Sequence, residues 1–318
     1  MTVPRSRRAL RNSLLGALSV VLLQCGARYW RHDAALPNSP TAAPPASAPA
    51  TRAGPAGPAT PVAVPSASSA PALRGSEASI SRSLHVALGT PRDADPSDEY
   101  HLDERSFVLS YNPERRVANW VAWQLDATHL GHVGRKDDFR ADLALPARFY
   151  RVKESDYLHS GYDRGHLCPS ADRQRSAEEN SRTFLFTNIQ PQLHELNAGP
   201  WEKLESYARR RAQRGAHLYV VAGGIFGAPF LTIGNGVAVP AANFKIIVEL
   251  KPGQSVSDVD ENTEVLAVSM PNERGVGDRA WTEYLTTVDA IERVSGYDFL
   301  NAIPERVQRV IEARTARP

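Results

Sequence analysis

The apolar positions of this chain predict a series of short strands and a few helices between about residues 106 and 300. Residues 107–109 and 117–125 are apolar runs separated by Asn112-Pro113-Glu114, which is the pattern of two strands joined by a turn. The β-forming residues at 183–189 predict a further strand. Alternation of apolar and polar positions predicts three more, at residues 217–221, 244–250 and 265–270. Glycine pairs predict turns at residues 223–224 and 234–236.

Three segments have helical features. Ser176 and Glu179 form a Ser-x-x-Glu capping box, which predicts a short helix. Pro200 suits a first helical turn and begins a predicted helix to about residue 214. The buried face of that helix would carry Trp201, Leu204 and Ala208. A last helix is predicted at residues 286–294, with Val288, Ile291 and Val294 on one face and Gly296 as its end.

The first 33 residues have the features of an export signal. Arginines precede an apolar run at residues 14–23, which is too short to span a bilayer comfortably as a helix. Cys25 resembles a lipoprotein cysteine, although Gln24 departs from the small residue expected before it. We therefore predict an exported protein, periplasmic or extracellular. The alternatives are a lipoprotein anchored to a membrane at Cys25 and, since acidic residues are lacking before Asp33, a mitochondrial protein.

Residues 34–78 are dominated by Pro, Ala, Ser and Thr, which predicts a disordered linker before a folded domain at residues 79–318. The whole chain holds 37 basic and 35 acidic residues, of which residues 1–78 hold eight and two. The domain therefore keeps 29 basic and 33 acidic residues, a net charge of −4. Binding of nucleic acid to this domain would have to rely on local basic patches rather than on bulk charge.

Reactive side chains are concentrated at residues 160–172. An acid, a guanidinium, an imidazole and a thiol fall within residues 163–168. Gly161 and Gly165 allow the backbone to turn sharply or to approach a ligand closely. Such a density of reactive groups between glycines is more typical of a site than of a packing face.

This stretch and a second one at residues 187–205 together resemble the sugar-non-specific DNA/RNA endonucleases of the ββα-metal type, the group that contains endonuclease G. The family signature is Asp-Arg-Gly-His, followed about thirty residues later by Asn-x-x-Pro-Gln, Leu-Asn and Trp-x-x-Leu-Glu. The matching blocks here are residues 163–166, 188–192, 196–197 and 201–205. The resemblance implies an α+β protein with the ββα-metal (His-Me finger) fold, in which helices flank a central mixed, largely antiparallel sheet.

The resemblance also implies an activity: Mg²⁺-dependent hydrolysis of DNA and RNA to products with 5′-phosphates, with Mn²⁺ able to substitute. It assigns His166 as general base, Asn197 as direct metal ligand and Glu205 as a group that reaches the metal through water. Arg164 would contact phosphate, and Asn188 would orient site groups.

The residue types suit these roles. A free imidazole near pKa 6.5 is mostly neutral yet basic at neutral pH. Activity should therefore decline in acid, by pH 5, as His166 takes up its proton. The amide oxygen of Asn197 is a hard but neutral ligand, so it leaves the charge of Mg²⁺ undiminished for the phosphate.

Arginines are the candidates for binding the nucleic-acid backbone. The spacing of Arg135 before the main motif matches a phosphate-contacting arginine of the family, with Arg140 as its rival. The other candidates for attracting the backbone are Arg164, Arg173, Arg175, Arg182 and the arginines at residues 209–214. Backbone contacts carry no direct sequence information. The predicted partners are therefore DNA and RNA with little sequence specificity, and a second copy of the chain, because relatives often form homodimers.

Other interpretations stay open for single residues. Asn197 could cap a helix, and Glu205 could pair with Arg209 one turn on. The alternative function for the whole domain is a catalytically silent nucleic-acid-binding module of the same fold.

Two other kinds of site use the same stretch. Cys168 with His166 or His194 could form a cysteine hydrolase, but a nucleophile and base two residues apart point in opposite directions on a strand. A zinc site from His159, His166, Cys168 and His194 lacks paired ligand spacing.

Overall fold

The structure of this chain is a computed structural model that describes residues 80–318. The predicted signal at residues 1–33, the linker at residues 34–78 and the lipid anchor at Cys25 lie outside the described residues. Within residues 80–318, no helix is both long enough and apolar enough to cross a membrane.

Seven strands form one sheet, and all neighbouring strands in it are antiparallel. In sheet order they are β1 Tyr100–Asp103, β2 Val108–Asn112, β3 Val117–Leu125, β6 His217–Ile225, β9 Ala242–Leu250, β10 Glu264–Pro271 and β11 Leu285–Thr286. The strands predicted at residues 217–221, 244–250 and 265–270 lie within β6, β9 and β10 and are confirmed. The predicted strand–turn–strand at residues 107–125 is confirmed as β2 and β3.

Both faces of this sheet pack against other parts of the domain. Successive side chains of a strand point to opposite faces. In β3, Val121 and Trp123 belong to one hydrophobic core, whereas Trp120 and Ala122 belong to the other. The sheet therefore separates two cores.

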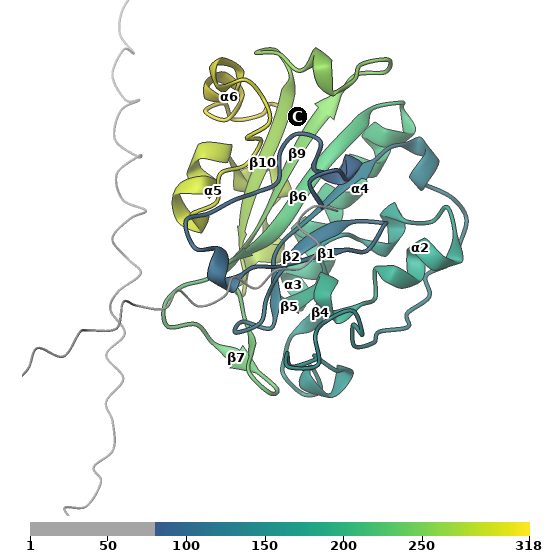
Figure 1. Cartoon of the computed structure of the whole chain (residues 1–318), viewed down its shortest axis with the longest axis vertical. Helices are drawn as coiled ribbons and strands as arrows, with labels where there is room; N and C mark the ends of the chain where they lie inside the picture. The colour runs from purple at the N-terminus through teal and green to yellow at the C-terminus, as the bar shows by residue number, and fades with distance from the viewer. Residues whose placement is uncertain (1–79) are drawn as a thin grey trace, which may run out of the picture. The chain divides into compact units, whose positions relative to one another are not determined.

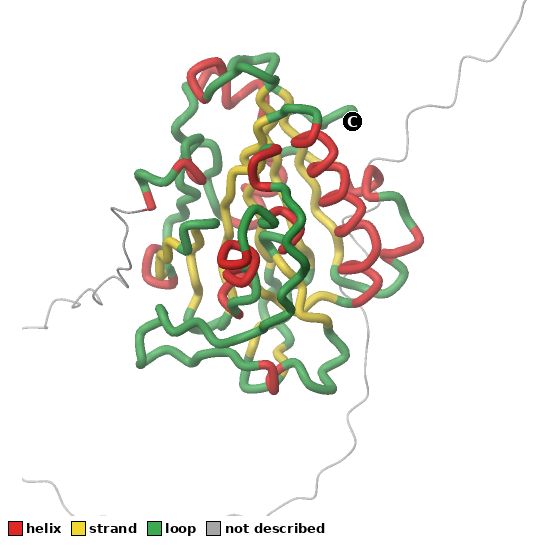
Figure 2. Tube along the Cα trace, turned by 90° about the vertical axis from the view of Figure 1, so that its right-hand side faces the viewer, coloured by secondary structure: helices red, strands yellow, loops and turns green. Residues whose placement is uncertain are grey.

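Helices cover each face. The helices after residue 80 are α2 Ala177–Arg182, α3 His194–Leu196, α4 Glu202–Gln213, α5 Val288–Ser295 and α6 Glu305–Ile311. α4 packs in the first core through Leu204 and Ala208, whereas α5 and α6 pack in the second through Ile291 and Val307. Accordingly α5 and α6 lie together on one side of the sheet, with β4 and α2 on the other (Figure 1). Figure 2 shows the strands running through the middle of the domain with helices and loops around them.

Short 3₁₀ turns fill many of the connections. They cover Leu84–Val86, Pro96–Asp98, Ala127–His129, Glu154–Asp156, Ser170–Asp172, Phe186–Asn188, Val256–Asp258, Val276–Asp278 and Trp281–Tyr284. A small separate pair, β7 Thr232–Ile233 and β8 Val237–Ala238, is joined by the turn predicted at residues 234–236, which is confirmed.

The main motif lies on a second, two-stranded sheet. β4 (Asp163–His166) pairs antiparallel with β5 (Ile189–Gln192), so that Asp163 lies opposite Gln192 and His166 opposite Ile189. A π-helical turn at Asn197–Trp201 then leads into α4. Two strands followed by a helix are the ββα arrangement that the resemblance implied, and the α+β fold is confirmed.

The strand predicted at residues 183–189 is wrong. Phe186–Asn188 form a 3₁₀ turn, and β5 begins only at Ile189. Phe184 and Phe186 are buried because their rings pack in the interior, not because the backbone there is extended. The Asn188 side chain closes the turn by donating to the Thr183 carbonyl at 2.9 Å.

The turn predicted at residues 223–224 is also wrong, because both glycines lie inside β6. A Cβ on Gly223 would lie 2.4 Å from the carbonyl oxygen of Asn119 and 2.8 Å from the ring of Phe244. Glycine is therefore needed at this point for close packing within the sheet rather than for a change of direction.

The predicted helix ends are mostly confirmed. The Ser176 hydroxyl accepts from the Glu179 N–H at 3.1 Å and caps α2, although the Glu179 carboxylate binds Arg175 instead of closing the box. Gly296 ends α5. The prediction that Val294 faces the core is wrong, since it is 57% exposed on the last turn of α5.

Candidate active site

A cleft with a volume of about 370 Å³ brings three of the predicted site residues together, namely Arg135, Arg164 and Asn197. The other residues that line it are Phe139, Glu154, Tyr157, Leu158, His159, Tyr162 and Asp163. The cleft is thus formed by the loop after β3, the segment before β4, β4 itself and the turn before α4.

Asp163 fixes the orientation of Asn197. Its Oδ2 accepts hydrogen bonds from Asn197 Nδ2 at 3.0 Å and from His194 Nδ1 at 2.8 Å. Since a carboxylate can only accept, the amide nitrogen of Asn197 must face Asp163. The amide oxygen then points away and makes no hydrogen bond to any described residue. The cleft therefore receives a neutral oxygen that is free to bind a cation or a donor.

Arg164 lines the same cleft as Asn197. It pairs with the Glu154 carboxylate, and its guanidinium carbon lies 4.1 Å from the centre of the Phe139 ring. The aromatic ring and the carboxylate together hold a planar group with several N–H donors at the cleft wall.

Arg135 supplies the second guanidinium. Its side chain donates to Ser170 Oγ at 3.3 Å, pairs with Asp137 at 3.2 Å and lies 4.8 Å from the centre of the Phe184 ring. Its rival Arg140 does not line the cleft, because it bonds to Asp138 and to the Ser181 carbonyl.

His166, at the end of β4, does not line the cleft itself, but its ring contacts Phe139, which does. Its ring packs against Phe139 and Phe184, with ring centres 5.5 and 5.0 Å apart, and it is 8% exposed. Its Nε2 is buried and has no hydrogen-bond partner among residues 80–318. Burial lowers the pKa of His166 to about 3, and the charges of Arg135 and Arg164 lower it in the same direction. The imidazole is therefore neutral at neutral pH.

Glu205 is buried in α4 and does not line the cleft. Its Oε1 accepts from Lys245 Nζ at 2.9 Å, and its Oε2 lies 4.0 Å from Arg209 Nη1. Lys245 is 1% exposed, and its ammonium lies 4.2 Å from the centre of the Trp201 ring. Burial raises the pKa of Glu205, and the charge of Lys245 partly opposes this. The pairing with Arg209 considered from the sequence is thus secondary to a shorter pair with Lys245.

Asn188 and Gly165 hold β4 in place. Asn188 is fully buried, and its side chain accepts from Cys168 N at 2.9 Å and donates to Cys168 O at 2.8 Å. A Cβ on Gly165 would lie 2.3 Å from Gln192 Oε1, so a larger residue here would displace the buried Gln192 side chain. Asn188 therefore acts on the site through the backbone that follows His166.

The prediction that Arg173 binds substrate is wrong. Arg173 is fully buried, and its guanidinium donates to the backbone carbonyls of Ser106, Asp172 and Gln124 at 2.7, 2.8 and 2.9 Å. These bonds join three segments of the interior, which leaves the charge out of reach of a nucleic acid.

The geometry weakens both rival sites. Cys168 is fully buried, and burial raises the pKa of its thiol to about 12, so it is protonated and shielded from a substrate. The zinc site would need His159, His166, Cys168 and His194. Within residues 80–318, no three of these side chains have ligand atoms within 4.8 Å of one another, so they do not form a zinc site.

Comparison with known proteins gives consistent matches. The model of a family described as DNA/RNA non-specific endonuclease matches residues 89–306. A protein named Nuclease from Nostoc sp. strain PCC 7120 is 42% identical over 245 residues, which cover 75% of this chain and 88% of that protein. Human mitochondrial Endonuclease G is 33% identical over 214 residues, covering 63% of this chain and 69% of that protein. A crystal structure of the EndoG/EndoGI complex contains a chain with a TM-score of 0.60 and 27% identity, covering 70% of this chain and 92% of that one.

Proposed function

Since this chain belongs to the DNA/RNA non-specific endonuclease family, whose members are metal-dependent nucleases, we propose that it is a Mg²⁺-dependent enzyme that cleaves both DNA and RNA. The products would carry 5′-phosphates, and Mn²⁺ would be able to replace Mg²⁺. The observation that carries the proposal is the free amide oxygen of Asn197, which Asp163 orients in a cleft that also holds Arg135 and Arg164.

The residues of the cleft fit a divalent metal ion. The oxygen of Asn197 is a hard, neutral ligand, and Mg²⁺ keeps several waters, so one direct protein ligand suffices. Asn197 would hold the ion directly, and Glu205 would reach it through water from Oε2, which lies 4.0 Å from Arg209 and keeps acceptor capacity. When bound, the ion supplies positive charge that stabilises the negative charge developing on the phosphate.

His166 would act as the general base. A neutral imidazole can accept the proton of the attacking water at Nε2, the nitrogen that no described residue occupies. In the free protein the charges of Arg135 and Arg164 weaken this base. A phosphate that pairs with both arginines would offset those charges, so binding of substrate would strengthen the base where it is needed.

The acid limit of activity tests this role. Burial places the pKa of His166 near 3 rather than 6.5, so kcat/KM, which reports the free enzyme, should stay level through pH 5 and fall only as pH approaches 3. The sequence predicted that activity would decline by pH 5, and the buried position of His166 moves the expected decline toward pH 3. Unfolded His166 binds its proton near pH 6.5, so the free energy of unfolding should fall between pH 6.5 and 3. The folded fraction must therefore be measured at each pH, and a half-maximal kcat/KM near pH 6.5 in folded protein would contradict the burial.

Arg164 would bind the phosphate, and replacing it separates charge from geometry. Arg164→Ala should lower kcat/KM by about 10–100-fold, because a hydrogen bond to a charged group contributes roughly 1.5–3 kcal/mol. Arg164→Lys should recover only part of this, since it keeps the charge but loses the planar donors and the contact with Phe139. Steady-state kinetics on plasmid DNA, with the exposed Arg309→Ala on α6 as matched control, measure both effects. Wild-type activity of the lysine variant would argue against bidentate binding, because charge alone would then suffice.

Asp163 would act as a positioning residue for Asn197. Asp163→Ala removes the acceptor that orients the amide, and loss of such a supporting bond typically costs 10–100-fold in metal affinity or activity. Asp163→Asn retains an acceptor oxygen and should therefore keep more activity than Asp163→Ala. The measurement is the Mg²⁺ concentration that gives half the maximal rate, which should rise in Asp163→Ala; an unchanged value would mean that Asp163 does not support the metal ligand.

The overall proposal is tested by incubating the purified full-length chain with supercoiled plasmid and with structured RNA, each with Mg²⁺, Mn²⁺ or a chelator. We expect both substrates to be cut with either ion and neither with chelator. The ends are identified by ligation, which requires 5′-phosphate. Binding of DNA without cutting would support the silent module, and ends that resist ligation until phosphorylated would contradict the predicted products.

The first 78 residues support a proposal for where the enzyme acts. We propose that residues 1–33 direct export and that residues 34–78 link the signal to the domain at residues 79–318. Relatives named as mitochondrial nucleases make import into mitochondria the alternative. Sequencing the amino terminus of the mature protein discriminates them. The homodimer and the lipid anchor at Cys25 stay predictions.

A further inference from the structure

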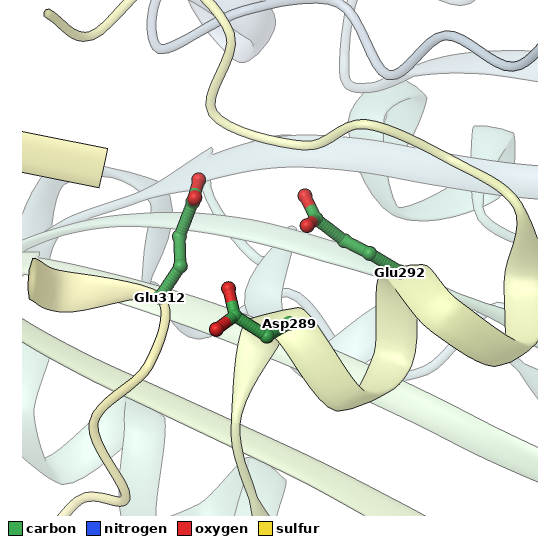
Figure 3. A group of neighbouring side chains, drawn as sticks. All are labelled: Asp289, Glu292 and Glu312. Carbon is green, nitrogen blue, oxygen red and sulfur yellow. The ribbon is translucent and has the colours of Figure 1, made fainter. Parts of the chain in front are cut away.

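Three carboxylates converge far along the chain from the candidate active site. Asp289 and Glu292 lie on α5, and Glu312 directly follows α6. One oxygen of each lies within 4.8 Å of the others. In Figure 3 the three carboxylate groups are turned toward a common space between the two helices.

Glu312 has nothing in the protein to balance its charge. It is 6% exposed, and its Oε1 is buried with no hydrogen-bond partner among the described residues. A buried carboxylate oxygen without a partner is costly. The charged groups that act on it, Glu292, Asp289 and Asp298, are all acidic.

The neighbouring carboxylates do not resolve this imbalance. Glu292 Oε1 accepts from the Phe299 N–H at 2.9 Å, which is the one hydrogen bond of this side chain within residues 80–318. No lysine or arginine of the described residues forms an ion pair with Asp289, Glu292 or Glu312. Arg309, one turn before Glu312, pairs with Glu305. The cluster therefore concentrates negative charge without a cation from the protein.

The donor set favours one kind of ligand. All ligands are hard carboxylate oxygens, which excludes a preference for zinc or another ion that favours nitrogen and sulfur. Ca²⁺ takes several carboxylate oxygens in a flexible geometry, whereas Mg²⁺ demands a near-ideal octahedron, keeps several waters and is usually bound by only one or two carboxylates. We propose that Asp289, Glu292 and Glu312 form a structural Ca²⁺ site that joins α5 to the end of α6.

This site would be separate from catalysis. α5 and α6 pack in the second core, whereas Trp201 and α4, which adjoin the candidate active site, pack in the first. The sheet lies between them (Figure 1). Ca²⁺ would thus hold the last helix of the chain on the sheet without touching the cleft, and this inference does not depend on the proposed nuclease mechanism.

The experiment measures Ca²⁺-dependent thermal stability of the full-length chain after removal of divalent ions with chelator. The wild type should gain roughly 5–10 °C in Tm at a Ca²⁺ concentration 100-fold above the dissociation constant. Mg²⁺ at the same concentration should give a smaller rise. Titration calorimetry with Ca²⁺ gives the dissociation constant and the stoichiometry.

Four variants test whether the rise in Tm comes from Ca²⁺ bound at Asp289, Glu292 and Glu312. Glu312→Gln should lose most of the rise and bind Ca²⁺ at least 10-fold more weakly, while it keeps wild-type cleavage of plasmid in Mg²⁺. Asp289→Asn should have the same two effects, and it replaces Glu312→Gln in the experiment if that variant does not fold. Asp289 is only half-buried, so the protein should tolerate this change. The exposed Glu305→Gln on α6 and the cleft variant Asn197→Ala should both keep the full rise.

Three outcomes would overturn the proposal. The first is a wild type whose Tm and heat of mixing do not respond to Ca²⁺, which would mean that protons alone neutralise the cluster. The second is a rise that persists in Glu312→Gln or disappears in Asn197→Ala, because the ion would then act elsewhere. The third is an equal or larger rise with Mg²⁺, which would contradict the assignment to Ca²⁺.

Discussion

His166→Ala is expected to lower kcat for plasmid cleavage by about 10²–10⁴-fold, the usual contribution of a positioned general base. The imidazole is neutral, and its Nε2 is the buried nitrogen that no residue between 80 and 318 satisfies. A buried polar atom without a protein partner can hold a water molecule. An attacking water at the cleft would be that molecule, and alanine removes the only group proposed to accept its proton.

Loss of folding must be distinguished from loss of chemistry, because the His166 ring packs between Phe139 and Phe184 and its removal leaves a cavity. His166→Asn fills more of that space and still lacks the base, so it should be as inactive as His166→Ala but more stable. His132→Ala replaces an exposed histidine of the loop after β3 and serves as matched control. Cleavage by a folded His166→Asn variant within threefold of the wild-type rate would exclude His166 as the base.

The long strands and the motif blocks could be predicted from the sequence because each depends on neighbouring residues. β3, β9 and β10 are buried on both faces and β6 is buried on one face and half-buried on the other, so their apolar positions stand out against the polar turns. The same rule failed at residues 183–189, where Phe184 and Phe186 are buried by contacts of their rings rather than by extended pairing. Apolar content alone does not distinguish these two causes of burial.

The parts of the site that could not be predicted depend on contacts between distant residues. Arg173 resembles any other arginine near the motif, yet its guanidinium bonds to carbonyls 67 and 49 positions away and is buried. Lys245 lies 40 positions from Glu205, and no local pattern shows that the two form a buried pair. Asp163 is part of the motif and is visible in the sequence. Its hydrogen bonds to His194 and Asn197 could not be predicted, because they form only when β4 lies next to the turn before α4.

Asn197→Ala is expected to reduce the maximal rate by about 10²–10³-fold and to raise the Mg²⁺ concentration needed for half the maximal rate, because a metal ion contributes several kcal/mol of stabilisation to developing charge. The change removes the one free protein oxygen that Asp163 orients toward the cleft. The Asp163 carboxylate then loses one of its two hydrogen bonds but keeps His194, so the cleft should remain folded. The measurement is the rate of plasmid cleavage as a function of Mg²⁺ concentration.

The matched control is Asn262→Ala, which makes the same chemical change in an exposed loop before β10. Asn197→Asp is the more informative variant, because it keeps an oxygen ligand but places a second carboxylate where Asp163 accepts a hydrogen bond at 3.0 Å. Like charges at that distance repel, so Asn197→Asp should bind Mg²⁺ yet misplace it and should recover little activity. If Asn197→Ala cleaved plasmid with the Mg²⁺ dependence of the wild type, the ion would be held by other residues and the proposed metal site would be wrong. A neutral amide suits this position because its nitrogen can donate a hydrogen bond to the Asp163 carboxylate while its oxygen binds the metal ion. A carboxylate at position 197 could not donate this bond and would repel Asp163.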